Sequence, residues 1–288
     1  MIFMNPYKKF VSDFAGLVSE GKSFPLGKVP PLPLPHRGAD APKALFFSPH
    51  PDDECISGSL ALRVMREAGM NLMNVAVTQG SKKERQAERW RELQEACNYI
   101  GFGLIATGPN GLERVNPKTR EGDPQHWNAC VKIIANILAE HQPRIIFFPH
   151  ERDWNSAHIG THLLVMDAVK QMRADFECYL VETEFWGQMD DPNLMVEISL
   201  EDLTDMVTAL TFHVGEVQRN PYHLLLPAWM MDNVRRGSEL VGGQGGVAPD
   251  FIFAALCRLS KWSQGRIKPC LSSGKHISRH TNVGELFS

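Results

Sequence analysis

The chain alternates between short apolar runs and longer amphipathic runs from Lys43 to Glu184, and this alternation constrains its fold more than any other feature. Strands are expected over residues 43–49, 71–80, 103–108, 143–150 and 176–184, and helices over residues 57–69, 83–100, 125–141 and 157–172. Strands that alternate with helices of this length are typical of right-handed β-α-β units, which build a parallel sheet. The expected fold class is therefore α/β, a Rossmann-like parallel sheet with helices on both faces.

The residues before and after this region are assigned to flanking segments. An amphipathic helix is expected over residues 1–23, because apolar side chains recur there at helical spacing; they are Phe3, Tyr7, Phe10, Val11, Phe14 and Leu17. The proline-rich stretch that follows cannot be helical and is expected to form an extended strap. The predicted organisation is an N-terminal helix and strap over residues 1–42, a main domain over residues 43–263 and a C-terminal tail over residues 264–288.

The balance of charge excludes several classes of partner. The 30 basic and 33 acidic residues give a net charge of -3, so neither nucleic acid nor an anionic membrane surface is expected. No apolar run is long enough to span a bilayer, and the N-terminus lacks the pattern of a secretory leader. Six widely spaced cysteines without a CxxC pair favour buried thiols in a reducing compartment. We expect a cytoplasmic protein that binds a small molecule, has no nucleic-acid partner and does not insert into membranes; a homo-oligomer stays open.

Two polar loops follow two of the expected strands. The first reads SPHPDDE over residues 48–54, and the second reads PHERDWNSAH over residues 149–158. Because ligands of parallel sheets bind at the carboxyl ends of the strands, the two loops can converge on one crevice. The three adjacent carboxylates of the first loop repel one another wherever they lose hydration, so a divalent cation is expected to compensate them.

A metal site with an open coordination position needs about three protein ligands, usually histidines and carboxylates. If the two loops meet, His50, Asp53 and His158 supply that set and leave Asp52 free. The alternative for the acidic loop is a helix N-cap, which would explain the aspartates but not His50. His162, four residues after His158, is expected in the core or in support of a ligand. Six further histidines are expected to be ordinary surface or core residues, namely His126, His141, His213, His223, His276 and His280.

Taken in order, these motifs resemble the LmbE/PIG-L family of zinc-dependent de-N-acetylases. The series is a strand followed by SPHPDDE, a strand ending in VTQG, the helix RWRELQEACNYIG, and a strand followed by PHERDWNSAH, between about Lys43 and Val169. The resemblance implies that Zn²⁺, or another divalent metal such as Fe²⁺, is held by His50, Asp53 and His158. It also implies that Asp52 is the general base.

The same resemblance places Arg89 near the substrate. The alternative is that Arg89 is a solvated helical charge paired with Glu88 or Glu92.

The second loop departs from the family's usual pattern. The family reads His-Pro-Asp-His or His-Ser-Asn-His, whereas this chain reads Asn155-Ser156-Ala157-His158. Asn155 is the expected catalytic replacement: it can donate a hydrogen bond to a developing oxyanion but cannot transfer a proton. Asp153 is grouped with Arg89 as a substrate-binding residue, and it is also expected to take the orienting part that is lost at Ala157.

The resemblance implies a hydrolase that removes the acetyl group from an N-acetylglucosamine-type amino sugar or its conjugate, with metal-activated water and Asp52 as the base. Two alternatives stay open. One is a metal-dependent hydratase or a non-sugar amidohydrolase of the same family. The other is a catalytically weak protein that binds a sugar or a metal.

Overall fold

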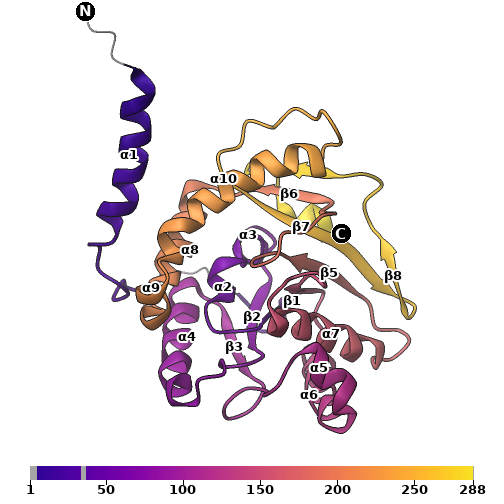
Figure 1. The fold of residues 1–288 in the computed structure, drawn as a ribbon. Helices are drawn as coiled ribbons and strands as arrows, with labels where there is room; N and C mark the ends of the chain where they lie inside the picture. The colour runs from indigo at the N-terminus through magenta and orange to yellow at the C-terminus, as the bar shows by residue number, and fades with distance from the viewer. Residues whose placement is uncertain (1–4, 34–36, 288) are drawn as a thin grey trace, which may run out of the picture.

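The computed structural model describes residues 5–33 and 37–287. One nine-stranded sheet runs through the molecule, and helices pack on both of its faces (Figure 1). The predicted Rossmann-like α/β class is therefore confirmed. Phe3 of the expected N-terminal helix and residues 34–36 of the expected strap lie outside the described residues.

The first half of the sheet is parallel, as the alternation predicts. Its strands lie in the order β3-β2-β1-β4-β5; they are β1 (Lys43–Ser48), β2 (Asn71–Ala76), β3 (Gly103–Ala106), β4 (Ile145–Pro149) and β5 (Cys178–Thr183). The order reverses direction between β1 and β4, where crossovers leave to opposite sides. Open parallel sheets form their ligand crevice at such a point. The two polar loops follow β1 and β4, so the topology places both at that crevice.

Strand β1 shows why both faces of the sheet are covered. Ala44 and Phe46 join one hydrophobic core, whereas Leu45 and Phe47 join a second core on the other face. Successive side chains of a strand point to opposite faces, so a continuous apolar run requires helices on both. The first core takes up α2 (Asp53–Ile56), α3 (Ser59–Glu67) and α4 (Gln86–Ile100), which η1 (Lys83–Arg85) precedes; the second takes up α6 (Pro124–His141) and α7 (Ser156–Lys170), beside the short α5 (Pro117–Gly122).

The second half of the sheet is antiparallel, which the alternation did not predict. Long strand β7 pairs antiparallel with β5, β6 and β8, and β9 pairs parallel with β6. The elements of this half are α8 (Leu200–Leu210), α9 (Val214–Arg219), α10 (Tyr222–Leu240), β6 (Leu194–Glu197), β7 (Ala254–Ser263), β8 (Arg266–Pro269), β9 (Lys275–Ile277) and η2 (Val283–Phe287). Strands β8 and β9 come from the segment assigned to a C-terminal tail, and both are built into the sheet.

The helix expected over residues 57–69 forms as α3 (Ser59–Glu67), and the short helix α2 (Asp53–Ile56) precedes it, where no helix was expected. Helix α2 begins at Asp53, and α3 begins at Ser59 after Gly58. A side chain at Gly58 would collide with the carbonyl oxygen of Glu54, so glycine permits this tight junction. The Asp52 side chain makes no capping hydrogen bond to α2, and a capping role therefore does not account for it.

Helix α1 (Pro6–Gly21) projects from the body of the molecule, with Asn5 capping its start (Figure 1). Its apolar stripe, which the sequence predicts, is largely exposed. The extended strap that follows packs Leu26 and Leu32 against the first core. Within the described residues no helix is both long enough and apolar enough to cross a membrane. All six cysteines are free, and every one except Cys270 is buried.

Candidate metal centre

The loop after β1 presents two of the expected ligands on one side. The Asp53 Oδ2 atom accepts a hydrogen bond of 2.8 Å from the backbone N–H of His50. The same oxygen lies 3.5 Å from the His50 Nδ1 atom. Because these two contacts close the three-residue turn, the imidazole of His50 and the carboxylate of Asp53 face one point.

The loop after β4 brings the third expected ligand to the same point. Asn155 begins α7 as its N-cap, with its side-chain Oδ1 accepting from the N–H of Ala157 at 2.9 Å. His158 therefore lies in the first turn of α7, close to the end of β4. Its Nε2 atom lies 3.4 Å from the Asp53 Oδ2 atom.

These three residues fit a divalent metal ion. Each offers one ligand atom, and the ligand atoms of His50, Asp53 and His158 all lie within 4.8 Å of one another. The Nε2 atom of His158 is buried and has no hydrogen-bond partner among the described residues, which is costly unless a ligand satisfies it. Two imidazoles and one carboxylate are a donor set that suits Zn²⁺ and Fe²⁺.

Asp153 contacts the side of the His158 ring that faces away from Asp53. Its side chain is fully buried; Oδ1 accepts from the N–H of Asn155 at 2.8 Å, and Oδ2 lies 3.5 Å from the Nδ1 atom of His158. A carboxylate on the outer nitrogen of a ligating histidine fixes its tautomer and ring orientation. The structure thus places Asp153 where it can orient His158, and it is not among the residues that line the clefts described below.

Asp53 and His158 each favour the charged form of the other. Burial alone would raise the pKa of Asp53, but the His158 and His50 rings outweigh burial and lower it. Burial opposes charge on His158 as well, yet Asp53 and Asp153 raise the pKa of its ring. Both shifts arise from contacts among these residues and Asp153.

Asp52 stands beside this group without joining it. Its φ of 117° is in the left-handed region, which non-glycine residues rarely adopt. Burial, followed by the neighbouring charge of Asp53, raises the pKa of Asp52 well above its ordinary value, while Arg89 opposes the rise. A carboxylate with a raised pKa is suited to accept and return a proton near neutral pH.

Arg89 reaches this site rather than solvent. Its Nη2 atom donates to the carbonyl oxygen of Pro51 at 2.8 Å and lies 3.9 Å from the Asp52 Oδ1 atom, and its Nε atom lies 3.7 Å from a carboxylate oxygen of Glu216. The alternative pairing of Arg89 with Glu88 or Glu92 is not what the structure has. Glu216 comes from α9, and no motif in the sequence marks it as part of this site.

A buried pair, Glu54 and His213, contacts the backbone of Asp52 and was not predicted from the sequence. The Oε1 atom of Glu54 accepts from His213 Nε2 at 2.7 Å and from the Cys55 thiol at 3.2 Å, and its Oε2 atom accepts from the N–H of Asp52 at 3.1 Å. Glu54, Cys55 and His213 are also close enough together to hold an ion. Because the Glu54 oxygens already accept these three hydrogen bonds, the geometry is that of a hydrogen-bonded network. His213 thus has a specific partner, and nothing in the sequence pairs it with Glu54.

His162 has partners of its own. Its Nδ1 atom donates to the carbonyl oxygen of Pro149 at 3.0 Å and lies 3.4 Å from Glu182. Burial lowers the pKa of His162 despite the nearby Glu182. His162 is not among the residues grouped with His50, Asp53 and His158.

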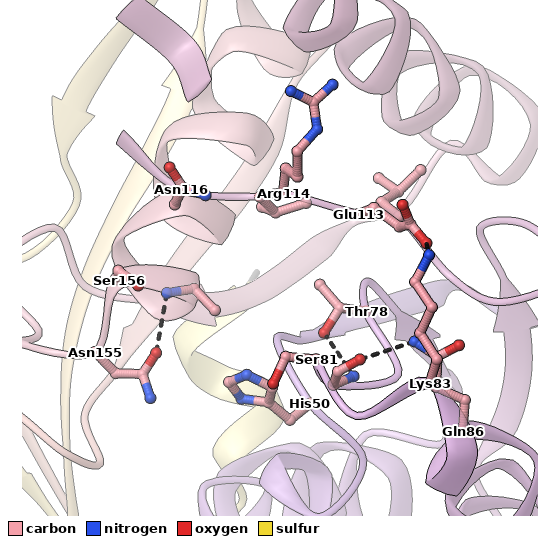
Figure 2. A pocket seen from close by; sticks show the side chains of 14 residues that line it. His50, Thr78, Ser81, Lys83, Gln86, Glu113, Arg114, Asn116, Asn155 and Ser156 are labelled. Carbon is pink, nitrogen blue, oxygen red and sulfur yellow. Dashed lines mark hydrogen bonds and ion pairs between the residues drawn. The ribbon is translucent and has the colours of Figure 1, made fainter. Parts of the chain in front are cut away.

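Two clefts meet at the centre. The metal cleft, of about 530 Å³, is lined by His50, Asp52, Asp53, Gly80, Ser81, Arg89, Asn155, Phe185, Trp186, Glu216, Arg219, Asn220 and Tyr222. The side cleft, of about 430 Å³, shares His50, Gly80, Ser81 and Asn155 with it. Figure 2 shows the side cleft, with His50 facing Asn155 and the Lys83 ammonium paired with Glu113 at 3.1 Å. The centre is therefore open to a ligand from two sides.

Comparison with known proteins confirms the family resemblance. Residues 45–169 match the family described as PIG-L, GlcNAc-PI de-N-acetylase. A curated relative, the 1D-myo-inositol 2-acetamido-2-deoxy-alpha-D-glucopyranoside deacetylase of Mycobacterium leprae, is 24% identical over 46% of this chain and 51% of its own length. The chain thus spans about half the length of the curated relatives it matches.

Solved structures show the same fold. The N,N'-diacetylchitobiose deacetylase of Pyrococcus horikoshii is 18% identical, with a TM-score of 0.57 and coverage of 92% of this chain and 96% of that one. The 4-carboxy-2-hydroxymuconate hydratase of Pseudomonas putida is 14% identical, with a TM-score of 0.53 and coverage of 76% of this chain and 95% of that one. At these identities the likeness establishes the fold alone.

Proposed function

We propose that this chain, whose residues 45–169 match the PIG-L de-N-acetylase family, is a metal-dependent hydrolase that removes an acetyl group from an N-acetylglucosamine-type sugar or its conjugate. The observation that carries the proposal is the grouping of His50, Asp53 and His158 around an unsatisfied imidazole nitrogen, with the free carboxylate of Asp52 beside it. A divalent ion, when bound there, acidifies water and polarises an amide carbonyl. The deacetylases from Mycobacterium leprae and Pyrococcus horikoshii support the substrate class.

Asp52 is the proposed general base and then the general acid. Its carboxylate lines the metal cleft, and its raised pKa favours taking the proton of the attacking water. The same carboxyl group then gives that proton to the leaving amine, because Asn155 has no proton to transfer. Arg89 holds the loop through the Pro51 carbonyl and limits how far the pKa of Asp52 rises.

Asn155 is the proposed donor to the oxyanion. Its Oδ1 atom is engaged as the cap of α7, which fixes the plane of the amide. The amide nitrogen belongs to a side chain that borders both clefts. A fixed donor of this kind stabilises negative charge on the tetrahedral intermediate without moving at the moment of reaction.

A hydratase acting on an unsaturated dicarboxylate is the second candidate, because a hydratase shares the fold. Such a substrate requires cations that are free to bind carboxylates. The metal cleft is lined by two arginines, Arg89 and Arg219, which both contact the carboxylate of Glu216, and by the further carboxylates of Asp52 and Asp53. In the side cleft Lys83 pairs with Glu113 and Arg114 with Asp123. A neutral, hydroxyl-bearing sugar suits these walls better.

The third alternative is a protein that only binds a sugar or a metal. Such a protein has no use for Asp52 beside His50, Asp53 and His158.

The test is release of acetate and free amine from N-acetylglucosamine and its conjugates by protein loaded with Zn²⁺ or Fe²⁺. Asp52→Asn should abolish release while the bound metal, measured by elemental analysis, stays at the wild-type level. Turnover by Asp52→Asn at the wild-type rate would refute the mechanism. No acetate from a broad panel, together with hydration of an unsaturated diacid, would favour the hydratase.

A further inference from the structure

The metal cleft has one aromatic wall and one polar wall. Phe185, Trp186 and Tyr222 form the aromatic wall, with ring centroids 4.7 Å apart for Phe185 and Trp186 and 5.8 Å apart for Trp186 and Tyr222. The polar wall carries Arg89 and Glu216, which are paired with each other. A ligand for this cleft therefore has an apolar face and a hydrogen-bonding edge.

The aromatic wall continues beyond the cleft to Trp154. The rings of Trp154 and Trp186 meet edge to face, with centroids 5.9 Å apart. Trp154 is 72% exposed, which is unusual for so large an apolar side chain beside a functional centre. Its indole N–H already donates to the carbonyl oxygen of Trp186, so its exposed surface offers a ring and no hydrogen-bond donor.

This wall is held rigidly by buried polar contacts. His150 Nε2 donates to the carbonyl oxygen of Gly187 at 2.8 Å, which ties the segment after β5 to the loop after β4. Arg236 Nη1 donates to Glu184 Oε1 at 2.6 Å, and both side chains are buried. A Cβ at Gly187 would lie 2.8 Å from the Cα atom of Asp153, so the two segments are in close contact. Binding to a wall that is already ordered loses little conformational entropy.

We infer that Trp154 and Trp186 form an outer subsite for a second pyranose ring, linked to the acetylated sugar at the metal centre. A pyranose has an apolar C–H face that stacks on aromatic rings, and its hydroxyl groups meet the polar wall. An alkyl chain in the same place would desolvate Arg89 and Glu216 without replacing their hydrogen bonds. The inference rests on the proposed function, and it names the substrate class as a disaccharide or a larger glycoconjugate.

The test compares N-acetylglucosamine with N,N'-diacetylchitobiose, using the full chain loaded with Zn²⁺. Trp154→Ala should lower kcat/KM for the disaccharide by about 5- to 10-fold, mainly through KM, as expected when one ring contact is lost. The monosaccharide should be unaffected, and Trp154→Phe should recover most of the loss. Tyr7→Ala is the matched control, because Tyr7 is 74% exposed and lies on α1, away from the cleft.

Calorimetry separates failure of the subsite from failure of the proposed function. Direct titration of Trp154→Ala with the disaccharide should show an equally large rise in Kd, whether or not acetate is released. Binding that depends on Trp154 without any acetate release would sink the proposed function and leave the subsite standing. Equal losses for both sugars, no loss for either, or a loss confined to a long-chain N-acylglucosamine would overturn the subsite.

Discussion

Asn155 combines two functions in one side chain, a helix cap and a proposed oxyanion donor. Asparagine is among the best N-cap residues, and here its Oδ1 atom caps α7. That leaves only the amide nitrogen to face a ligand. An experiment at this position must therefore separate the loss of the cap from the loss of the donor.

Asn155→Asp makes that separation, because aspartate keeps the capping oxygen and has no donor. We expect its turnover to fall by about 10- to 1000-fold, as for the loss of an oxyanion donor, with folding stability preserved. Asn155→Ala should show a similar fall in turnover and also lose about 1 kcal/mol of stability with the cap. Steady-state kinetics and urea unfolding measure the two effects. Wild-type turnover in Asn155→Asp would show that the residue only caps the helix.

The acid limb of the pH profile should report Asp52. Because a base must be deprotonated to act, the rate falls as pH falls through the pKa of Asp52, which is raised by burial and the Asp53 charge. Arg89 lowers that pKa, so Arg89→Met should raise it further and move the acid limb of kcat/KM to higher pH. Arg89→Lys keeps the charge and should move it less. A shift to lower pH in Arg89→Met would contradict this assignment.

Some residues of the centre could be predicted from the sequence and others could not. His50, Asp53 and His158 are brought together because each follows a neighbouring parallel strand, and that rule applies to a sequence. The partnership of Glu54 and His213 spans 159 residues and joins α2 to the N-cap residue of α9. No local pattern encodes that distance. Predicting it requires knowing how α8 and α9 pack on the sheet.

Helix α9 is connected to α2 and to Asp52 through that pair. His213 donates to Glu54, and Glu54 accepts from the N–H of Asp52. This second hydrogen bond holds Asp52 in its unusual backbone conformation, with φ of 117°. Packing of α8 and α9 thus affects the position of the proposed base.

His213→Phe should destabilise the protein and lower its activity. Burial opposes charge on His213, but Glu54 raises the pKa of its ring, and the change removes this partner from the buried carboxylate of Glu54. Breaking a buried pair of this kind costs about 3 to 5 kcal/mol. Urea unfolding measures the loss, and kcat should fall because Asp52 is less firmly held. His223→Phe is the control: His223 is also buried, and burial lowers its pKa, so it sits neutral. Equal effects of the two changes would argue against a special role for the pair.

The elements themselves were predicted unevenly. Buried parallel strands such as β1 and β4 are short apolar runs between turns, and the sequence locates them well. The short helix α2 (Asp53–Ile56) was not predicted, because a helix of four residues is too short to show a helical period. The antiparallel pairing of β5 with β7 joins segments more than 70 residues apart, and strand pairing at that distance depends on the packing of the intervening α8, α9 and α10.

The C-terminal part of the chain completes a site that the parallel half of the sheet begins. Residues 45–169 provide the ligand group and Asp52. Glu216, Arg219 and Tyr222, which line the metal cleft, come from α9, its end and the start of α10. The segment matched by the family therefore carries the proposed chemistry, and the aromatic residues Phe185, Trp186 and Tyr222 of the cleft lie outside it.

Binding of a metal ion to the proposed ligands should raise the stability of the folded chain. A ligand that binds only the folded chain stabilises it by about 2.7 kcal/mol at 100 times its Kd, and each kcal/mol raises Tm by about 2 to 4 °C in a domain of roughly this size. Zn²⁺ should therefore raise Tm by several degrees in thermal unfolding, and a chelator should reverse the shift.

His158→Ala should lose the response, because the buried Nε2 atom that lacks a partner is removed. His162→Ala should keep the response at a lower starting Tm, since His162 bonds to Pro149. If both variants respond like the wild type, the ion binds elsewhere and the assignment of His50, Asp53 and His158 as ligands is wrong.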